Sequence, residues 1–216
     1  MSLPDSAHFL PLHPEEPIQR SANRLPHWEQ EGRTYLITFR LADSLPRSVL
    51  ETWDAERQAW LHWHPEPWSE AVEREYHQRF TQRWEQALDE GHGSCVLRDP
   101  ACAAIVGRAL SCFAGQRCEM FAWVVMPNHV HVLTALIAPW ELAQLLHSWK
   151  SFTAKEINRH RQTIGAVWQK DYHDRLLRDE AHFRKCVAYL RNNGPKAYLP
   201  PQAYLYWEAD WLHTIA

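Results

Sequence analysis

The sequence predicts an α+β fold, in which helices cover one face of a mainly antiparallel sheet. Two observations support this prediction: three runs of residues have the composition of strands, and helical periodicity fills most of the chain between and after them. The order of one strand, a helix, a pair of strands and further helices fits a ferredoxin-like arrangement. With 216 residues, of which 45% are hydrophobic, the chain can form one domain that carries an insertion.

The three predicted strands are residues 34–41, 118–125 and 129–136. In the first, aromatic and β-branched residues alternate, which is typical of a strand near the middle of a sheet. The second and third are separated only by Met126-Pro127-Asn128, so we expect them to pair through a short connection.

Helical spacing and start signals predict the remaining elements. Asp99 and Pro100 form a good helix start, with the aspartate as N-cap and the proline in the first helical position. Gly194-Pro195 is expected to close the last helix. The predicted helices cover residues 47–63, 69–88, 100–113, 139–160 and 180–193.

These elements define one domain over residues 34–200, with the helical segment 47–90 inserted into it. Residues 1–33 are expected to form an N-terminal extension, and residues 201–216 a C-terminal tail. Residues 167–177 have no regular pattern.

The composition indicates a soluble, cytoplasmic protein. The N-terminus has no basic start followed by an apolar run, and the sequence contains no stretch of about 18 apolar residues. The five cysteines are odd in number and form no CxxC pair, which favours reduced thiols over disulfides or a cysteine zinc site.

The charge distribution favours a nucleic-acid partner, although the net charge is −3. Residues 141–200 contain 11 Lys/Arg and six Asp/Glu, so this segment carries +5 and the remainder −8. A local basic field can bind a phosphate backbone whatever the total charge, although solvated helix faces give the same pattern. The candidate DNA-binding residues are Lys150, Lys155, Arg159, Arg175, Arg178, Lys185 and Lys196, with Trp149 and Trp168 for base stacking.

The strongest chemical signal is the pair His129 and His131. Because one residue separates them on a predicted strand, both imidazoles project from the same face, roughly 7 Å apart. They can converge on one cation, while Val130 and Val132 point into the core. A histidine pair without a metal role remains an alternative at this stage, since the chain has 14 histidines.

The last predicted helix offers an oxygen ligand and a nucleophile. Mg²⁺ and Mn²⁺ prefer oxygen ligands, so two imidazoles require a further one. Tyr189 and Asn193 are four residues apart and therefore neighbours on one helix edge, beside an apolar stripe that should face the sheet. Tyr189 is a candidate nucleophile whose hydroxyl needs a cation nearby, because its ordinary pKa is about 10. A half-buried structural tyrosine is the alternative, and Tyr172 is a rival nucleophile.

Several segments together resemble one family, the REP-associated tyrosine transposases, which are relatives of the single-tyrosine transposases of small bacterial insertion sequences. The resemblance spans roughly residues 34–197. The matching segments are MPNHVHVL (126–133), SWKSFTA (148–154), VWQ (167–169), RDE (178–180), FR (183–184), YLRNN (189–193) and KA (196–197), with YLITFRLADSLP (35–46) and GHGSC (91–95).

The resemblance implies a ferredoxin-like HUH domain that binds Mg²⁺ or Mn²⁺. It implies that His129, His131 and Asn193 are the metal ligands and that Tyr189 attacks single-stranded DNA beside a hairpin. The product would be a 5′-phosphotyrosine adduct and a free 3′-OH, which allows nicking and strand transfer. The implied partner is hairpin DNA of the REP type, in the nucleoid, and the protein could act as a monomer or a homodimer.

Two departures from the family pattern stand out. Relatives usually run Asn-Pro-Val-Lys-Ala after the helix, whereas this chain has Asn193-Gly194-Pro195-Lys196-Ala197. Many relatives have a histidine where this chain has Arg175. Two other functions stay open. One is a hairpin-binding protein that no longer cuts DNA and uses the basic region from Lys150 to Lys196. The other is a metal-dependent hydrolase that uses water.

Overall fold

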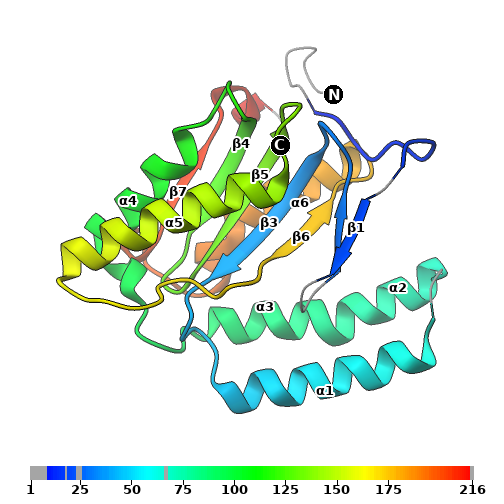
Figure 1. The fold of residues 1–216 in the computed structure, drawn as a ribbon, viewed down its shortest axis with the longest axis horizontal. Helices are drawn as coiled ribbons and strands as arrows, with labels where there is room; N and C mark the ends of the chain where they lie inside the picture. The colour runs from blue at the N-terminus through cyan, green and yellow to red at the C-terminus, as the bar shows by residue number, and fades with distance from the viewer. Residues whose placement is uncertain (1–8, 18, 23–25, 66–67, 215–216) are drawn as a thin grey trace.

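The structure is a computed structural model that describes residues 9–17, 19–22, 26–65 and 68–214. Its centre is a five-stranded antiparallel sheet with the strand order β6-β3-β5-β4-β7 (Figure 1). The strands are β3 (Thr34–Arg40), β4 (Cys118–Val125), β5 (His129–Leu136), β6 (His173–Leu176) and β7 (Leu205–Glu208).

The chain order confirms the predicted α+β fold. The strands β3, β4, β5 and β6 alternate with the helices α4 (Pro100–Ser111) and α5 (Leu142–Arg161) in the order β-α-β-β-α-β, with β3 and β5 at the centre. This is the ferredoxin-like arrangement. The side chain of Asp99 caps α4 by accepting a hydrogen bond from the amide of Ala101.

Helices cover both faces of the sheet, whereas the sequence predicted one. The helices α4 and α5 pack on one face, and α6 (Glu180–Lys196) packs on the other (Figure 1). Every residue of β5 is buried, so both faces of this central strand are covered by other parts of the fold.

The predicted insertion is a helical hairpin with its own aromatic core. It consists of α1 (Arg47–Trp63), α2 (Glu70–Tyr76), a π-helical turn (His77–Thr81) and α3 (Gln82–Asp89). Trp53, Trp60, Phe80 and Trp84 are buried between its helices. The hairpin extends below the sheet in Figure 1, and α3 returns the chain toward it.

The ends of the predicted domain need correction. Residues 205–208, expected in a tail, form β7 and pair with β4. Before the sheet, β1 (Gln19–Ala22) and β2 (Pro26–Glu29) form a hairpin within the predicted extension. Short 3-10 segments cover Val96–Arg98, Pro201–Ala203 and Asp210–Thr214.

The last helix does not end at Gly194-Pro195 but continues through both residues to Lys196. Pro195 has no amide hydrogen to donate to the carbonyl of Arg191, and the helix ends one residue after it. Gly194 is required for packing, since a Cβ atom at this position would lie 2.3 Å from the ring of Tyr204. Among the described residues, no helix is both long and apolar enough to span a membrane.

Candidate metal and nucleophile site

His129 and His131 begin β5 and point toward α6. The alternation of the strand places Val130 and Val132 in the core under α4 and α5, which leaves both imidazoles on the opposite face. Each histidine is only 1% exposed. The centroids of the two rings lie 4.7 Å apart.

A hydrogen-bond relay fixes the orientation of the His129 ring. The side-chain amide of Asn128 donates to the carbonyl of His92 at 3.1 Å, which turns its Oδ1 toward His129. Nδ1 of His129 then donates to that oxygen at 2.8 Å. Because the proton is on Nδ1, Nε2 carries the lone pair that a metal ion needs.

His131 connects the sheet to the nucleophile candidate. Its Nδ1 lies 2.7 Å from the hydroxyl of Thr38 on the neighbouring strand. Its Nε2 lies 3.2 Å from the hydroxyl of Tyr189 on α6. The structure therefore brings the predicted tyrosine to the predicted histidine pair.

Asn193 follows Tyr189 by one helical turn and is also 1% exposed. Neither its amide oxygen nor its amide nitrogen makes a hydrogen bond within the described part of the chain, and the same holds for Nε2 of His129. Buried polar atoms rarely lack partners. The Asn193 amide nevertheless lies close enough to His129 and Tyr189 to affect the pKa of each.

Burial keeps both histidines neutral. Loss of solvent lowers the pKa of His129 to about 3 and the pKa of His131 well below its usual range, and the nearby Lys196 lowers both further. Burial also raises the pKa of the Tyr189 phenol well above 10, and the negative charge of Glu85 adds to this rise. Neutral imidazoles suit metal ligation, whereas the tyrosine needs positive charge nearby to ionise.

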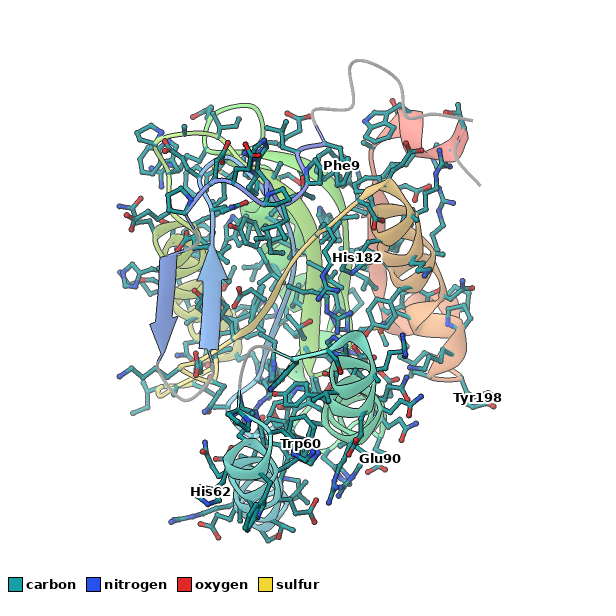
Figure 2. All side chains as sticks on the ribbon, turned by 90° about the vertical axis from the view of Figure 1, so that its right-hand side faces the viewer. Phe9, Trp60, His62, Glu90, His182 and Tyr198 are labelled. Carbon is teal, nitrogen blue, oxygen red and sulfur yellow. The ribbon has the colours of Figure 1, made fainter. Side chains whose placement is uncertain are left out.

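Two carboxylates at the site come from the helical insertion, and the sequence did not indicate them. Glu85 and Asp89 lie one turn apart on α3. Oδ1 of Asp89 lies 4.0 Å from Nε2 of His129, and Oδ2 of Asp89 lies 3.5 Å from Nζ of Lys196 at the end of α6. Figure 2 shows α3, which ends beside the labelled Glu90, on the same side of the sheet as α6.

The residues present fit a divalent cation. Among the described residues, Nε2 of His129 and the Asn193 amide are buried without hydrogen-bond partners. An oxygen of the Asp89 carboxylate lies 4.0 Å from the former, and His131 contacts the His129 ring. Two neutral imidazoles with oxygen ligands suit Mn²⁺ and are acceptable to Mg²⁺.

The predicted DNA-binding side chains divide between the two faces of the fold. Arg175 on β6 and Lys196 on α6 lie near the histidine pair, since their charges lower the pKa of His131. Lys155 and Arg159 are exposed on α5, across the sheet from that pair. The other three are Lys150 on α5, whose ammonium group donates to the carbonyl of Lys170, exposed Arg178 before α6, and exposed Lys185 on α6.

The two tryptophans proposed for base stacking lie in the core instead. Trp149 is 1% exposed and Trp168 is 7% exposed. The indole of Trp168 donates to Thr153 and packs edge-on against Phe39. Neither ring has a free face for a base, because the apolar stripe of α5 and the segment after it both fill the core on that side of the sheet.

The rival nucleophile Tyr172 lies in a different setting. It packs against the core cluster under α4 and α5, whereas Tyr189 packs against the cluster under α6. Burial raises the pKa of Tyr172, and the nearby Asp174 and Glu29 raise it further. Burial favours the neutral phenol in both tyrosines, so what distinguishes Tyr189 is its contact with His131.

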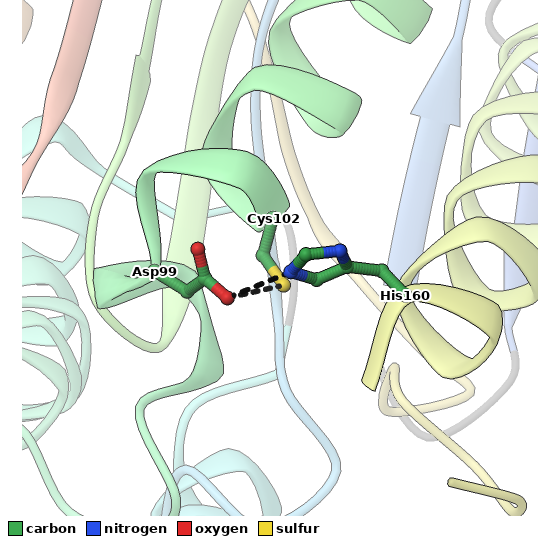
Figure 3. A group of neighbouring side chains, drawn as sticks. All are labelled: Asp99, Cys102 and His160. Atoms are coloured by element: carbon green, nitrogen blue, oxygen red, sulfur yellow. Dashed lines mark hydrogen bonds and ion pairs between the residues drawn. The ribbon is translucent and has the colours of Figure 1, made fainter. Parts of the chain in front are cut away.

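A second group of potential metal ligands lies across the sheet from the histidine pair: Asp99, Cys102 and His160, from the start of α4 and the end of α5 (Figure 3). Oδ2 of Asp99 lies 3.0 Å from Nε2 of His160 and 3.7 Å from Sγ of Cys102. Burial raises the pKa of the Cys102 thiol to about 11, so the thiol stays protonated at neutral pH. The contacts fit a helix cap with an ion pair.

A strand that presents two neutral histidines beside a helical tyrosine and amide has the layout that the resemblance implies for a single-tyrosine HUH domain. Residues 107–193 match the family model described as "Transposase IS200 like", so the resemblance to these transposases is confirmed over that segment. The segment contains His129, His131, Tyr189 and Asn193.

Two solved structures are similar to this chain. One is a REP-associated tyrosine transposase bound to a REP hairpin, with 15% identity, a TM-score of 0.43, and coverage of 86% of this chain and 90% of that chain. The other is a protein of Deinococcus radiodurans R1 described provisionally as a transposase, with 14% identity, a TM-score of 0.35, and coverage of 76% and 98%. A search of curated proteins finds no match.

Proposed function

We propose that this protein nicks and rejoins single-stranded DNA at hairpins of the REP type, with Tyr189 as nucleophile and a divalent cation as cofactor. One observation carries the proposal: the Tyr189 hydroxyl lies 3.2 Å from His131, close to buried atoms of His129 and Asn193 that lack partners among the described residues.

The cation would be held by Nε2 of His129, Nε2 of His131 and the amide oxygen of Asn193. When bound, Mg²⁺ or Mn²⁺ supplies positive charge that neutralises the scissile phosphate and orients it for attack. The chain's own contribution is rigidity. Asn128 and Thr38 hold the two rings in place through their Nδ1 atoms, and α6 holds the tyrosine and the amide on one edge.

The reaction is a transesterification that conserves phosphodiester bonds. The phenolic oxygen of Tyr189 bonds to the phosphorus, the bond from phosphorus to the 3′ oxygen breaks, and that oxygen leaves as a free 3′-OH. The proton lost from the tyrosine balances the one gained by the leaving oxygen. Attack by a 3′-OH on the phosphotyrosine reverses these steps and rejoins the DNA without ATP.

Positive side chains on the site's own face support a nucleic-acid substrate. Arg175, Arg178, Lys185 and Lys196 lie on β6, before α6 or on α6, around the face that carries the histidines. The choice of a hairpin as substrate rests on the family resemblance of the motifs.

The test is covalent trapping. Incubation of the protein with 5′- and 3′-labelled hairpin oligonucleotides and Mn²⁺ should give a protein–DNA band that resists denaturation and retains only the label 3′ to the nick. Tyr189→Phe should abolish that band. Tyr198→Phe is the matched control, because Tyr198 is 95% exposed near the end of the same helix.

The alternatives give different results in the same assay. A binding protein without chemistry would shift the hairpin in native gels and form no adduct with any divalent metal. A hydrolase that uses water would release free ends and would not depend on Tyr189.

A further inference from the structure

The helical insertion reaches the candidate metal site through the last turn of α3. Asp89 is the final residue of that helix, and its side chain is 14% exposed. Its Oδ1 lies 4.0 Å from Nε2 of His129, which is buried and has no hydrogen-bond partner in the described chain. The insertion therefore places an oxygen donor beside the lone pair of a predicted ligand.

The distance suits two ligands of one ion better than a direct bond. A spacing of 4.0 Å is too long for a hydrogen bond. Two ligands about 2.1 Å from an octahedral Mg²⁺ stand about 3.0 Å apart when adjacent and about 4.2 Å apart when opposite. The 4.0 Å between Asp89 and His129 is close to the spacing of opposite ligands.

The charge balance of the site also favours a carboxylate ligand. The two histidines are neutral and the Asn193 amide carries no charge, so these three ligands leave the full charge of a divalent ion uncompensated in a buried pocket. Lys196 and Arg175 add further positive charge. Among the residues that the structure describes, Asp89 is the carboxylate that lies within 4.0 Å of His129.

The packing of α3 holds Asp89 in this position. The ring centroids of the buried Trp84 and Trp53 lie 4.8 Å apart. The guanidinium of Arg40 lies 5.1 Å from the centroid of the Trp84 ring. Arg40 is on β3, where it pairs with His129 of β5. Leu88 is buried in the insertion core. With Trp84 and Leu88 facing inward, the helix turns Glu85 and Asp89 toward the site.

We propose that Asp89 is a further protein ligand of the catalytic cation, so that the helical insertion completes the metal site. The inference rests on the proposed function, since it assumes that His129, His131 and Asn193 hold a metal. In this arrangement Lys196 is the counter-ion of Asp89 in the metal-free protein, and the cation competes for the same carboxylate.

The experiment is a Mn²⁺ titration of the full chain, with free Mn²⁺ measured by electron paramagnetic resonance, so no DNA or activity is required. Asp89→Ala and Asp89→Asn should each weaken binding by at least about tenfold, as loss of a metal contact does. Glu85→Gln is the matched control, because it removes the same charge one turn away on α3. It should weaken binding by much less. Lys196→Gln should strengthen binding, since it removes a competing positive charge.

Each outcome is decisive. Equal affinity for wild type and both Asp89 variants would overturn the inference, and so would equal losses in Asp89→Asn and Glu85→Gln, which would show a long-range charge effect. His129→Ala separates the two proposals: if it abolishes binding while the Asp89 variants bind normally, the metal site stands and the role of Asp89 fails. If the wild-type protein binds no Mn²⁺, both fail. Circular dichroism and thermal melts confirm that each variant is folded.

Discussion

The hydroxyl of Tyr189 lies 3.2 Å from Nε2 of His131, although the two residues are 58 positions apart and belong to different layers of the fold. The sheet fixes the histidine through Thr38, and α6 fixes the tyrosine above it. Asn193 lies on the same helix edge, and its buried amide atoms, like Nε2 of His129, lack partners among the described residues. The following predictions test that site.

Asn193→Ala should separate metal binding from folding. The amide makes no hydrogen bond with the described residues, so its removal breaks none and leaves a small cavity. The free energy of unfolding of the metal-free protein should therefore fall by about 1 kcal/mol or less. Wild type should gain thermal stability on addition of Mn²⁺, and the variant should lose most of that gain. Differential scanning calorimetry with and without metal measures both effects. An equal Mn²⁺ gain in wild type and variant would remove Asn193 from the ligand set.

Acid should destabilise the metal-free protein through its buried histidines. In the fold, burial lowers the pKa of His129 to about 3, whereas in the unfolded chain it is about 6.5. Protons therefore bind the unfolded state preferentially, and the contribution to stability, full above pH 6.5, is lost as the pH falls toward 3. Between pH 7 and pH 5 this one histidine should cost about 2 kcal/mol.

Urea unfolding in the presence of EDTA at pH 7, 6 and 5 measures this loss. His129→Gln should show a visibly smaller decrease in unfolding free energy over the same range. If wild type and variant lose stability in parallel, His129 is not the neutral buried group described above.

The two basic faces should contribute differently to DNA binding. Lys185→Gln, on α6, should weaken binding to a hairpin. It should also reduce the magnitude of the slope of log affinity against log salt concentration by about 1, the contribution of one phosphate contact. Lys155→Gln, on α5 across the sheet from the histidines, should leave the affinity and the slope unchanged. Fluorescence anisotropy over a range of salt concentrations compares the two. The opposite order would place the DNA on the α5 face.

Gly194→Ala should perturb the end of α6. The new Cβ would lie 2.3 Å from the Tyr204 ring, so the helix or the ring must move, at a cost of about 1–3 kcal/mol. A double-mutant cycle with Tyr204→Ala tests the cause. Strong coupling between the two substitutions is expected, and additive effects would show that the ring is not the obstacle.

The local parts of the fold and site could be predicted from the sequence. Strand-like composition predicted the strands Cys118–Val125 and His129–Leu136, and the single residue between the two histidines predicted their shared face. Spacing by four predicted that Tyr189 and Asn193 share a helix edge. The family motifs then connected these two pairs.

The remaining features depend on tertiary packing, which leaves no local pattern. β6 and β7 are four residues each and carry mixed polar and apolar side chains, so their strand character comes from pairing with β3 and β4. Gly194-Pro195 has the composition of a helix stop, but contacts with Tyr204 accommodate it within α6. Asp89 could not be singled out because nothing in a charged surface helix reveals which acidic residue turns inward.

The measurement that tests the central claim most directly is mass spectrometry of the trypsin-digested protein–DNA adduct. Trypsin should release residues 186–191 (CVAYLR), in which Tyr189 is the sole tyrosine, and separately residues 171–175 (DYHDR), which contain Tyr172. We predict a 5′-phosphonucleotide on the first peptide. Modification of the second peptide, or cleavage of the DNA without any modified tyrosine, would contradict the account.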